Sequence, residues 1–372
     1  MSEPRPRSPH LQDGLRDDLV GSCSQYLPVG DTNLKILLGS HFFTPSVGGV
    51  ETVSRLLAEH WSRLGHEVIV ITTTLASSDE FPYSVIRRPT AIRLLKLIKW
   101  ADVFFQNNIS LRTAWPLAFT RRPWFVTTAT WLDSTDRRTG WRIGIKSLAL
   151  RRAKNIYISR AVAAHVGLPG CLIPNPYDAE IFQRQTDLPQ DLDLVFVGRL
   201  VSQKGVDILL HALAQLATRG LRPNTTLIGD GPEETELRRL ATELRLADQL
   251  VFAGPRQGAD LARLIARHRI MVVPSRWAET FGVVALEGIA CGCAVVGSVE
   301  GGLTDAIGPC GLTFPNGSSD ALAEVLAGLL SGDCQQISRF LDNAPAHLAK
   351  HAPGTIARRY LEIFAQSSGT SL

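Results

Sequence analysis

The chain has 372 residues, with 39 Lys and Arg against 35 Asp and Glu, so its formal net charge is +4. At about 100 to 200 residues per domain, this length predicts two domains, each able to bury its own core. Hydrophobic residues make up 45% and charged residues 20%, a balance that excludes a disordered chain. No apolar run reaches the roughly 18 residues that a membrane-spanning helix needs.

Cysteine usage and the first residues indicate the compartment. Six cysteines are scattered without the paired spacing of a zinc site or the density of a secreted disulfide scaffold. They favour a reducing, cytoplasmic compartment. Residues 1–33 mix Pro, Arg, Asp and Ser and lack the apolar core of a signal peptide, so we expect a disordered leader there.

Charge is unevenly distributed along the chain. Residues 81–160 hold 16 Lys and Arg against three acids, hence a net charge of +13, which leaves −9 for the remainder. This asymmetry favours either a solvated basic face or an anionic partner, such as lipid headgroups on the inner face of a membrane. We expect no nucleic acid, because no recognised nucleic-acid-binding motif accompanies these residues. The segment AIRLLKLIKW, residues 91–100, is typical either of a membrane-interface helix or of a basic-edged helix packed on a sheet.

The first half alternates short apolar runs with segments of helical periodicity. Its predicted strands are 35–43, 65–72, 103–106, 124–128, 156–159 and 171–173. Its predicted helices are 51–64, 91–100, 141–153 and 159–166.

A second alternation starts after the stretch 187–191. Its predicted strands are 192–198, 225–229, 249–254, 269–275 and 293–298, and its predicted helices are 206–218, 233–244, 260–267 and 282–291. Continuous apolar strands that alternate with helices predict parallel sheets covered on both faces. The fold class is therefore α/β, with two doubly wound, Rossmann-like domains over 34–186 and 187–350 that face a central cleft.

Two segments of the second half carry candidate site residues. VGRLVSQKG, residues 197–205, places Arg199 and Lys204 on a loop between a strand and a helix, where two cations could hold a diphosphate or simply face solvent. AETFGVVALEG, residues 278–288, separates Glu279 from Glu287 by eight residues. A helical spacing of that length is about 12 Å, which favours two separate ligand contacts over the closer carboxylate pair of a hydrolase.

Gly48 and Gly49 precede the first predicted helix in TPSVGGVE. Glycines there either let backbone amides approach a phosphate or serve a tight turn. The spacing is not the G-x-G-x-x-G of a dinucleotide-binding fold, which disfavours a Rossmann dehydrogenase.

Taken in order, the segments resemble the large retaining nucleotide-sugar glycosyltransferase family of GT-B fold, the glycosyl transferases group 1 or family 4 type. The resemblance covers residues 34 to about 331 and is carried by SVGGVE, GHEVIVIT, IPNPYD, VGRLVSQKG, LIGDGPE, PSRWAETFGVVALEG and CGCAVVGSVEGGLTD. It implies transfer of a sugar from a nucleoside diphosphate donor to a saccharide or lipid-linked acceptor, with retained configuration and without a metal or other cofactor. It also implies that residues 351–372 contain a helix that crosses back to the first domain.

The resemblance assigns roles to the candidate residues. Arg199 and Lys204 would hold the donor diphosphate, and Glu279 would lie near the donor sugar. Glu287 would bind the ribose. The backbone contacts would come from Phe281, Gly282 and Val283 in the second domain and from Gly48 and Gly49 in the first.

One segment departs from the family pattern. Many members carry a His after the strand 124–128, where this chain has Thr128, Ala129 and Thr130. A hydroxyl, Asp133 or His41 would serve instead, or the chain is a weakened or inactive copy. The leading interpretation is a retaining glycosyltransferase of cell-surface polysaccharide synthesis, cytoplasmic or peripheral on the membrane. The alternative is a non-catalytic binding or scaffold protein that kept the fold. The sequence leaves open the donor base, the sugar, the acceptor and the oligomeric state.

Overall fold

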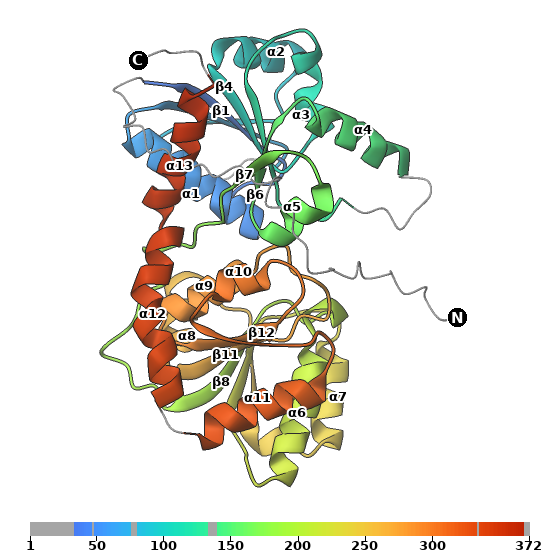
Figure 1. Cartoon of the computed structure of the whole chain (residues 1–372), viewed down its shortest axis with the longest axis vertical. Helices are drawn as coiled ribbons and strands as arrows, with labels where there is room; N and C mark the ends of the chain where they lie inside the picture. The colour runs from blue at the N-terminus through green and yellow to red at the C-terminus, as the bar shows by residue number, and fades with distance from the viewer. Residues whose placement is uncertain (1–32, 47, 76–79, 133–139, 333–334, 368–372) are drawn as a thin grey trace. The chain divides into compact units, whose positions relative to one another are not determined.

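The chain forms two compact units (Figure 1). This computed structural model describes residues 33–46, 48–75, 80–132, 140–332 and 335–367, so the predicted leader lies almost entirely outside the described residues. Unit 1 comprises residues 1–174 and 357–372, and unit 2 comprises residues 175–356. The sequence predicts these two boundaries after residues 186 and 350. No helix among the described residues is both long enough and apolar enough to span a bilayer.

Unit 1 is built on a seven-stranded sheet in the order β3-β2-β1-β4-β5-β6-β7, and every neighbouring pair is parallel. Strands β4 and β5 are buried throughout, which is why they appear in the sequence as continuous apolar runs rather than alternating ones. The strands are β1 (Lys35–Ser40), β2 (Glu67–Thr72), β3 (Ser84–Arg87), β4 (Val103–Asn107), β5 (Trp124–Thr128), β6 (Lys154–Tyr157) and β7 (Gly170–Leu172).

Helices cover both faces of this sheet. One face packs against α2, η2 and α4 through a core that includes Leu37, Phe104 and Val126. The other face presents Phe105 and Phe125 to aromatic residues of α1 and α13. The helical segments are α1 (Gly49–Arg63), α2 (Ala91–Trp100), α3 (Leu111–Ala114), η2 (Trp115–Ala118), α4 (Gly140–Leu150), α5 (Arg160–Val166) and α13 (Pro353–Ala365).

The structure decides between the two interpretations of the segment 91–100. Thr90 caps α2 by accepting a hydrogen bond from the Arg93 amide. The apolar stripe of the helix, Leu94, Leu97 and Ile98, is buried in the core of unit 1. Because this stripe is used for packing on the sheet, α2 is a basic-edged core helix rather than a membrane-interface helix.

The C-terminal helix α13 supplies part of the core of unit 1. The Trp61 indole on α1 donates a hydrogen bond to the Ala357 carbonyl (3.0 Å), and Tyr360 lies 3.0 Å from the Thr127 hydroxyl of β5. The Phe364 ring packs against Trp61 and Phe125, with centroids 5.5 and 4.7 Å apart. Unit 1 is therefore completed by residues that begin 185 positions after the end of its last strand, since 357 − 172 = 185.

Phe364→Ala should lower the free energy of unfolding of unit 1 by about 3–5 kcal/mol, because it empties a fully buried aromatic site. Chemical denaturation of the full chain, followed by tryptophan fluorescence, measures the loss. Arg358→Ala, on the exposed side of the same helix, is the matched control and should leave the transition in place. An equal effect of both variants would mean that α13 acts through its helical propensity rather than through the core.

Unit 2 is built on a six-stranded parallel sheet in the order β10-β9-β8-β11-β12-β13. The strands are β8 (Leu192–Val197), β9 (Thr225–Ile228), β10 (Leu250–Gly254), β11 (His268–Val273), β12 (Ala294–Ser298) and β13 (Gly311–Phe314). In both sheets the strand order reverses beside the first strand, at β1 and β4 in unit 1 and at β8 and β11 in unit 2. Ligands of doubly wound folds bind at this switch point, beyond the carboxyl ends of the strands.

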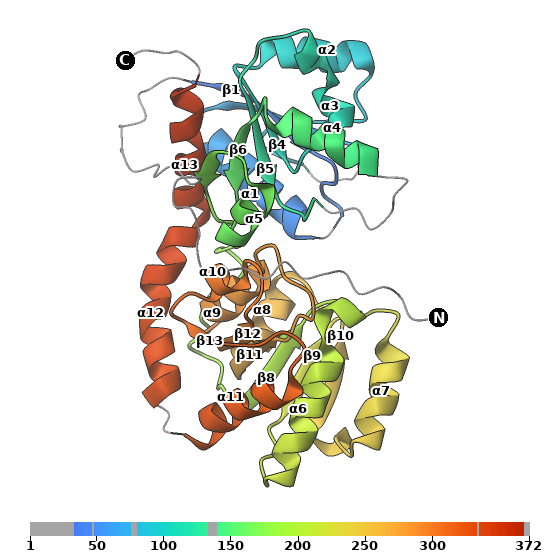
Figure 2. The ribbon, with the colours of Figure 1, turned by 45° about the vertical axis from the view of Figure 1, so that its right-hand side comes forward.

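Helices also cover both faces of the second sheet (Figure 2). On one face the core of unit 2 joins α6, α7 and α11 to β8, β11 and β12. On the other face α9 and α10 pack closely, with Met271 against Gly288 and Leu303 against Gly297. The helical segments are η3 (Ser202–Lys204), α6 (Val206–Thr218), α7 (Glu234–Glu243), η4 (Ala247–Gln249), α8 (Gly258–Ala266), α9 (Val283–Ala290), α10 (Leu303–Ile307), α11 (Ser319–Ser331) and α12 (Gln335–His351).

These two sheets confirm the predicted fold class of two doubly wound α/β domains. The cleft expected between them stays a prediction. Several short or atypical elements were not predicted. Strand β3 is only partly buried, β13 has four residues, and α12 contains a proline, Pro345. The prediction likewise lacks α3, α10 and α11.

Candidate active site

Two loops leave the switch point of the second sheet side by side. The loop after β8 carries Arg199 and Lys204, and the loop after β11 carries Glu279. Their parent strands are direct neighbours, with Met271 of β11 paired to Val195 of β8. The tertiary structure therefore brings together residues 75 positions apart in the sequence.

Gly205 allows the two loops to touch. It ends the η3 turn and begins α6 with a left-handed backbone, φ 67°. A Cβ atom at this position would lie 2.0 Å from the Pro274 carbonyl oxygen, so a larger residue would push the loops apart. The Arg276 amide also donates to the Gln203 carbonyl (2.9 Å), and its guanidinium pairs with Asp207 at the start of α6. Backbone contacts thus fix the distance between the cations and Glu279.

An ion pair joins the two loops. Lys204 Nζ lies 2.7 Å from Glu279 Oε1, and the Ser275 hydroxyl donates to the same oxygen at 2.6 Å. The two charged side chains keep 35% and 20% of their surface exposed, so both remain accessible to a ligand. Arg199 is exposed and forms no ion pair with any residue that the structure describes. Lys204 is therefore neutralised by Glu279, whereas the positive charge of Arg199 has no acidic partner among the described residues.

The N-terminus of α9 follows Glu279 by three residues in the sequence. Gly282 is its N-cap residue, with φ 90°, and no side chain caps the helix or places an acid in its first turn. Such an end offers backbone N–H groups and a positive partial charge to an anion. Phe281, buried and 5.7 Å from the His351 ring, anchors the turn that presents these amides. The predicted contacts from Phe281, Gly282 and Val283 are thus placed at a helix terminus suited to phosphate.

A further turn holds the backbone of Glu279. Gly301, at φ 86°, forms an isolated bridge with Glu279, and the Gly302 amide donates to the Glu279 carbonyl at 2.6 Å. Asn316 supports the same corner, since its side-chain amide donates to the Ser275 carbonyl and its oxygen accepts from the Glu300 amide. Ser275 and Asn316 were not predicted, and Asn316 has no sequence signal that links it to a loop 41 residues away.

Glu287 lies in the second turn of α9, where the helix spans only Val283–Ala290, so half of the Glu279-to-Glu287 segment is not helical. Burial and the neighbouring Asp178 carboxylate raise the pKa of Glu287 to about 7. Asp178 is itself buried and accepts hydrogen bonds from the amides of Glu180 and Ile181. The buried Glu287 carboxyl favours a ligand that donates hydrogen bonds, such as a pair of sugar hydroxyls.

Glu287→Gln should stabilise the protein at pH 8 by about 1–3 kcal/mol, and the gain should shrink toward pH 5. The folded pKa lies above the unfolded value near 4.3, so the native state binds the extra proton and loses stability as pH rises from about 4.5 to 7. Urea denaturation at both pH values measures the difference. A gain that does not depend on pH would show that Glu287 ionises normally in the folded chain.

In unit 1, Gly48 and Gly49 mark the start of α1. A Cβ atom on Gly49 would meet nothing within 4 Å, and one on Gly48 would meet only the flexible end of Glu51. Packing within the described chain therefore does not require glycine at residue 49. Polar residues that were not predicted hold this helix end, because Asn107 of β4 donates to the Val50 carbonyl and to Ser54, which in turn donates to Ser40 of β1.

The segment that departs from the family pattern lies at the carboxyl end of β5. The Thr128 hydroxyl is buried and has no hydrogen-bond partner among the described residues, whereas Thr130 is paired with Asn108. His41 is exposed after β1, with its ring 4.5 Å from that of Phe42. Asp133 lies outside the described residues. None of these positions reproduces an imidazole at the end of β5.

Known proteins share this architecture and part of this sequence. Over 204 residues, the chain is 33% identical to D-inositol 3-phosphate glycosyltransferase 2 of Catenulispora acidiphila. This alignment covers 52% of this chain and 47% of that protein. The chain thus matches about half the length of this relative. Sucrose-phosphate synthase of Thermosynechococcus elongatus superposes with a TM-score of 0.75 at 23% identity, covering 90% of this chain and 99% of that one. Anabaena HepE, solved with UDP and glucose, superposes with a TM-score of 0.73 at 22% identity, covering 90% of this chain and 100% of that one.

Two doubly wound units, with loops gathered at the switch point of the second sheet, give the chain the GT-B fold. The glycosyl transferases group 1 family model matches residues 178–347 of the chain, a little under half of its length. The matched range contains Arg199, Lys204, Glu279 and Glu287 and lies within unit 2.

Proposed function

We propose that this chain is a retaining glycosyltransferase that moves a sugar from a nucleoside diphosphate donor to a saccharide or lipid-linked acceptor. The observation that carries the proposal is the Lys204–Glu279 ion pair at the switch point of unit 2, with Arg199 uncompensated on the same loop. Cations fixed by backbone contacts can meet the charge that develops on a leaving diphosphate. The uncapped N-terminus of α9 adds backbone N–H groups, which carry a positive partial charge and can also bind the diphosphate.

In the proposed reaction, the bond between the anomeric carbon of the donor sugar and the diphosphate oxygen breaks. The acceptor hydroxyl bonds to the same face of that carbon, and its proton passes to the departing diphosphate. Arg199 and Lys204 would bind the diphosphate, and Glu279 would contact the sugar. The Glu287 carboxyl would accept hydrogen bonds from the ribose hydroxyls. In unit 1, Gly48 and Gly49 would approach the diphosphate with their backbone amides. This chemistry needs no metal, because the positive charges of Arg199 and Lys204 neutralise the diphosphate in its place.

UDP is the donor nucleotide that we favour, because solved structures of similar fold contain UDP or UDP-glucose. The acceptor that we propose is a hydroxyl of a saccharide or of a lipid-linked saccharide, in the assembly of a cell-surface polysaccharide on the cytoplasmic side of a membrane. The match to D-inositol 3-phosphate glycosyltransferases supports a polyhydroxylated acceptor with negative charge as an equal choice.

A UDP-sugar, but not GDP- or ADP-sugars, should raise the melting temperature of the full chain, and EDTA should not change the shift. A ligand at one hundred times its Kd stabilises the native state by about 2.7 kcal/mol. Lys204→Ala and Glu287→Ala should abolish the shift. Lys204→Ala should itself change stability by no more than about 1 kcal/mol, since the ion pair that it removes is partly exposed.

Arg263→Ala removes one exposed cation from α8 and is the matched control, so its nucleotide shift should equal that of the wild type. If no nucleotide class shifts the melting temperature, the donor site in unit 2 is wrong. If a nucleotide binds but no nucleoside diphosphate is released with any acceptor tested, the second candidate function holds. That candidate is a binding or scaffold protein, and the observation that favours it is the absence of an imidazole at residues 128–130.

A further inference from the structure

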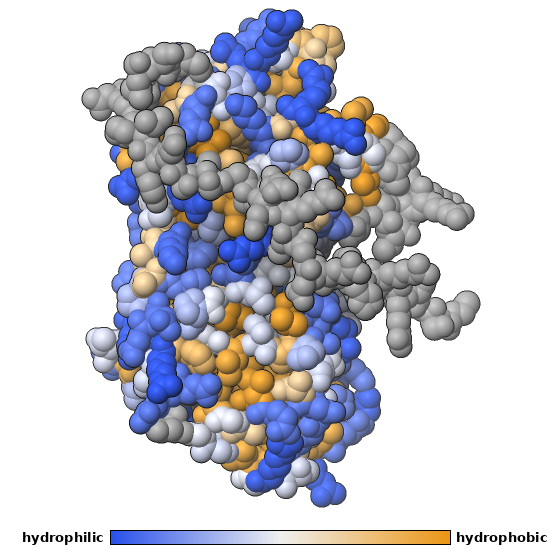
Figure 3. Space-filling view, viewed as in Figure 1, coloured by the Kyte–Doolittle hydropathy of each residue, from blue (hydrophilic) through white to orange (hydrophobic). Residues whose placement is uncertain are grey.

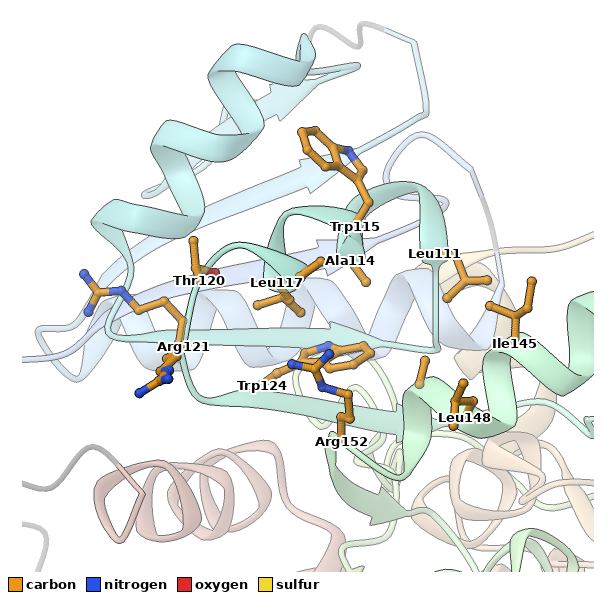
Figure 4. Close-up of a pocket in the computed structure, with 13 residues that line it drawn as sticks. Leu111, Ala114, Trp115, Leu117, Thr120, Arg121, Trp124, Ile145, Leu148 and Arg152 are labelled. Carbon is orange, nitrogen blue, oxygen red and sulfur yellow. The ribbon is translucent and has the colours of Figure 1, made fainter.

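A groove in unit 1 plays no part in the donor site. It has a volume of about 500 Å³, within the range of ligand-binding pockets, and opens between the α3–η2 segment and α4 (Figure 4). Trp124 of β5 lies between the two walls. The walls are mostly apolar and are formed by Leu111, Ala114, Trp115, Leu117, Ile145 and Leu148.

Large apolar side chains at this groove are exposed to solvent. Leu148 and Ile145 on α4 keep 64% and 44% of their surface, and Trp115 keeps 42%. Phe119 follows η2, is 77% exposed and lies edge to face with Trp115 at 6.3 Å. Figure 3 shows hydrophobic and hydrophilic residues interleaved on the face that carries α3 and α4. Clustered apolar exposure of this kind marks an interaction surface.

Arginines border the same groove. Arg121, Arg122 and Arg152 line it, and no acidic residue does. The Arg122 guanidinium donates to the Lys99 carbonyl, whereas Arg121 and Arg152 form no ion pair within the described part of the chain. The groove lies in the region 81–160, which carries a net charge of +13. Its chemistry therefore complements a molecule with an apolar tail and an anionic head.

We propose that this groove docks the protein on an anionic phospholipid membrane. One acyl chain enters between η2 and α4, and Arg121, Arg122 and Arg152 contact the phosphates of neighbouring headgroups. A free anion would leave Trp115, Ile145 and Leu148 uncovered, and a neutral apolar ligand would leave the arginines without partners. Helix α2 buries Leu94, Leu97 and Ile98 in the core, and Ile92 is its single large apolar side chain with high exposure, whereas the groove exposes three. This surface goes beyond sugar transfer, so the proposed reaction and the membrane contact can fail separately.

The test is flotation of the full chain with vesicles, without donor or acceptor. Vesicles that contain phosphatidylglycerol should bind the protein, vesicles of phosphatidylcholine alone should bind it weakly, and binding should fall as salt screens the charges. Arg121→Gln with Arg152→Gln should lower the affinity about 25-fold, at about fivefold for each arginine near a membrane surface. Ile145→Gln with Leu148→Gln should also weaken binding, with no change in melting temperature, because both side chains are exposed.

The matched control is Arg222→Gln with Arg263→Gln, which removes two exposed arginines from unit 2 and leaves the net charge equal to that of the groove variant. It should bind like the wild type. Acyl chains with bromine atoms should quench tryptophan fluorescence, and Trp115→Phe should reduce the quenching. Equal binding to both vesicle types, or an equal loss in the control variant, would overturn the proposal. The proposal would also be overturned if the protein bound no vesicles and instead formed a dimer that Leu148→Gln dissociates.

Discussion

The ion pair between Lys204 and Glu279 joins the two loops that leave the centre of the second sheet, and the rest of the candidate site is arranged around it. Neither side chain could hold this position on a mobile loop, because a partly exposed ion pair contributes little free energy by itself. Backbone contacts supply the rigidity instead. Gly205 lies against the Pro274 carbonyl, and Gly301 and Gly302 hold the backbone of Glu279. The charges are thus preorganised by glycines that permit close approach.

Several polar groups that follow strands of the two sheets are placed at a cost in stability. Glu287 has a pKa near 7 beside the Asp178 carboxylate, α9 begins without a side-chain cap, and the buried Thr128 hydroxyl has no partner among the described residues. Each of these costs stability in the unliganded chain. Such costs are typical of binding sites, where a ligand supplies the missing partners. They separate a site from an ordinary loop more clearly than charge alone.

The two units carry different kinds of information. Unit 2 contains the family match and the predicted donor residues, which are tied to one another by backbone geometry. Unit 1 contains the basic region, an exposed apolar groove and a glycine pair at α1 whose geometry the described chain does not require. Unit 1 also depends on the end of the chain, because Tyr360 and Phe364 complete its aromatic core. A function divided between a donor-binding unit and an acceptor-binding unit is consistent with the proposed reaction.

The sequence by itself determined the fold class, most buried strands, the two charged loops of unit 2 and the glycine turns, because continuous apolar runs and glycine positions are local signals. It did not predict β3 and β13, which are short and only partly buried, or α12, which contains Pro345. Only the tertiary structure decided that Lys204 meets Glu279 and that burial, together with Asp178, raises the pKa of Glu287. It also decided that the apolar stripe of α2 is buried while η2 and α4 form an open groove. These facts depend on contacts between residues far apart in the chain. No local pattern encodes such contacts.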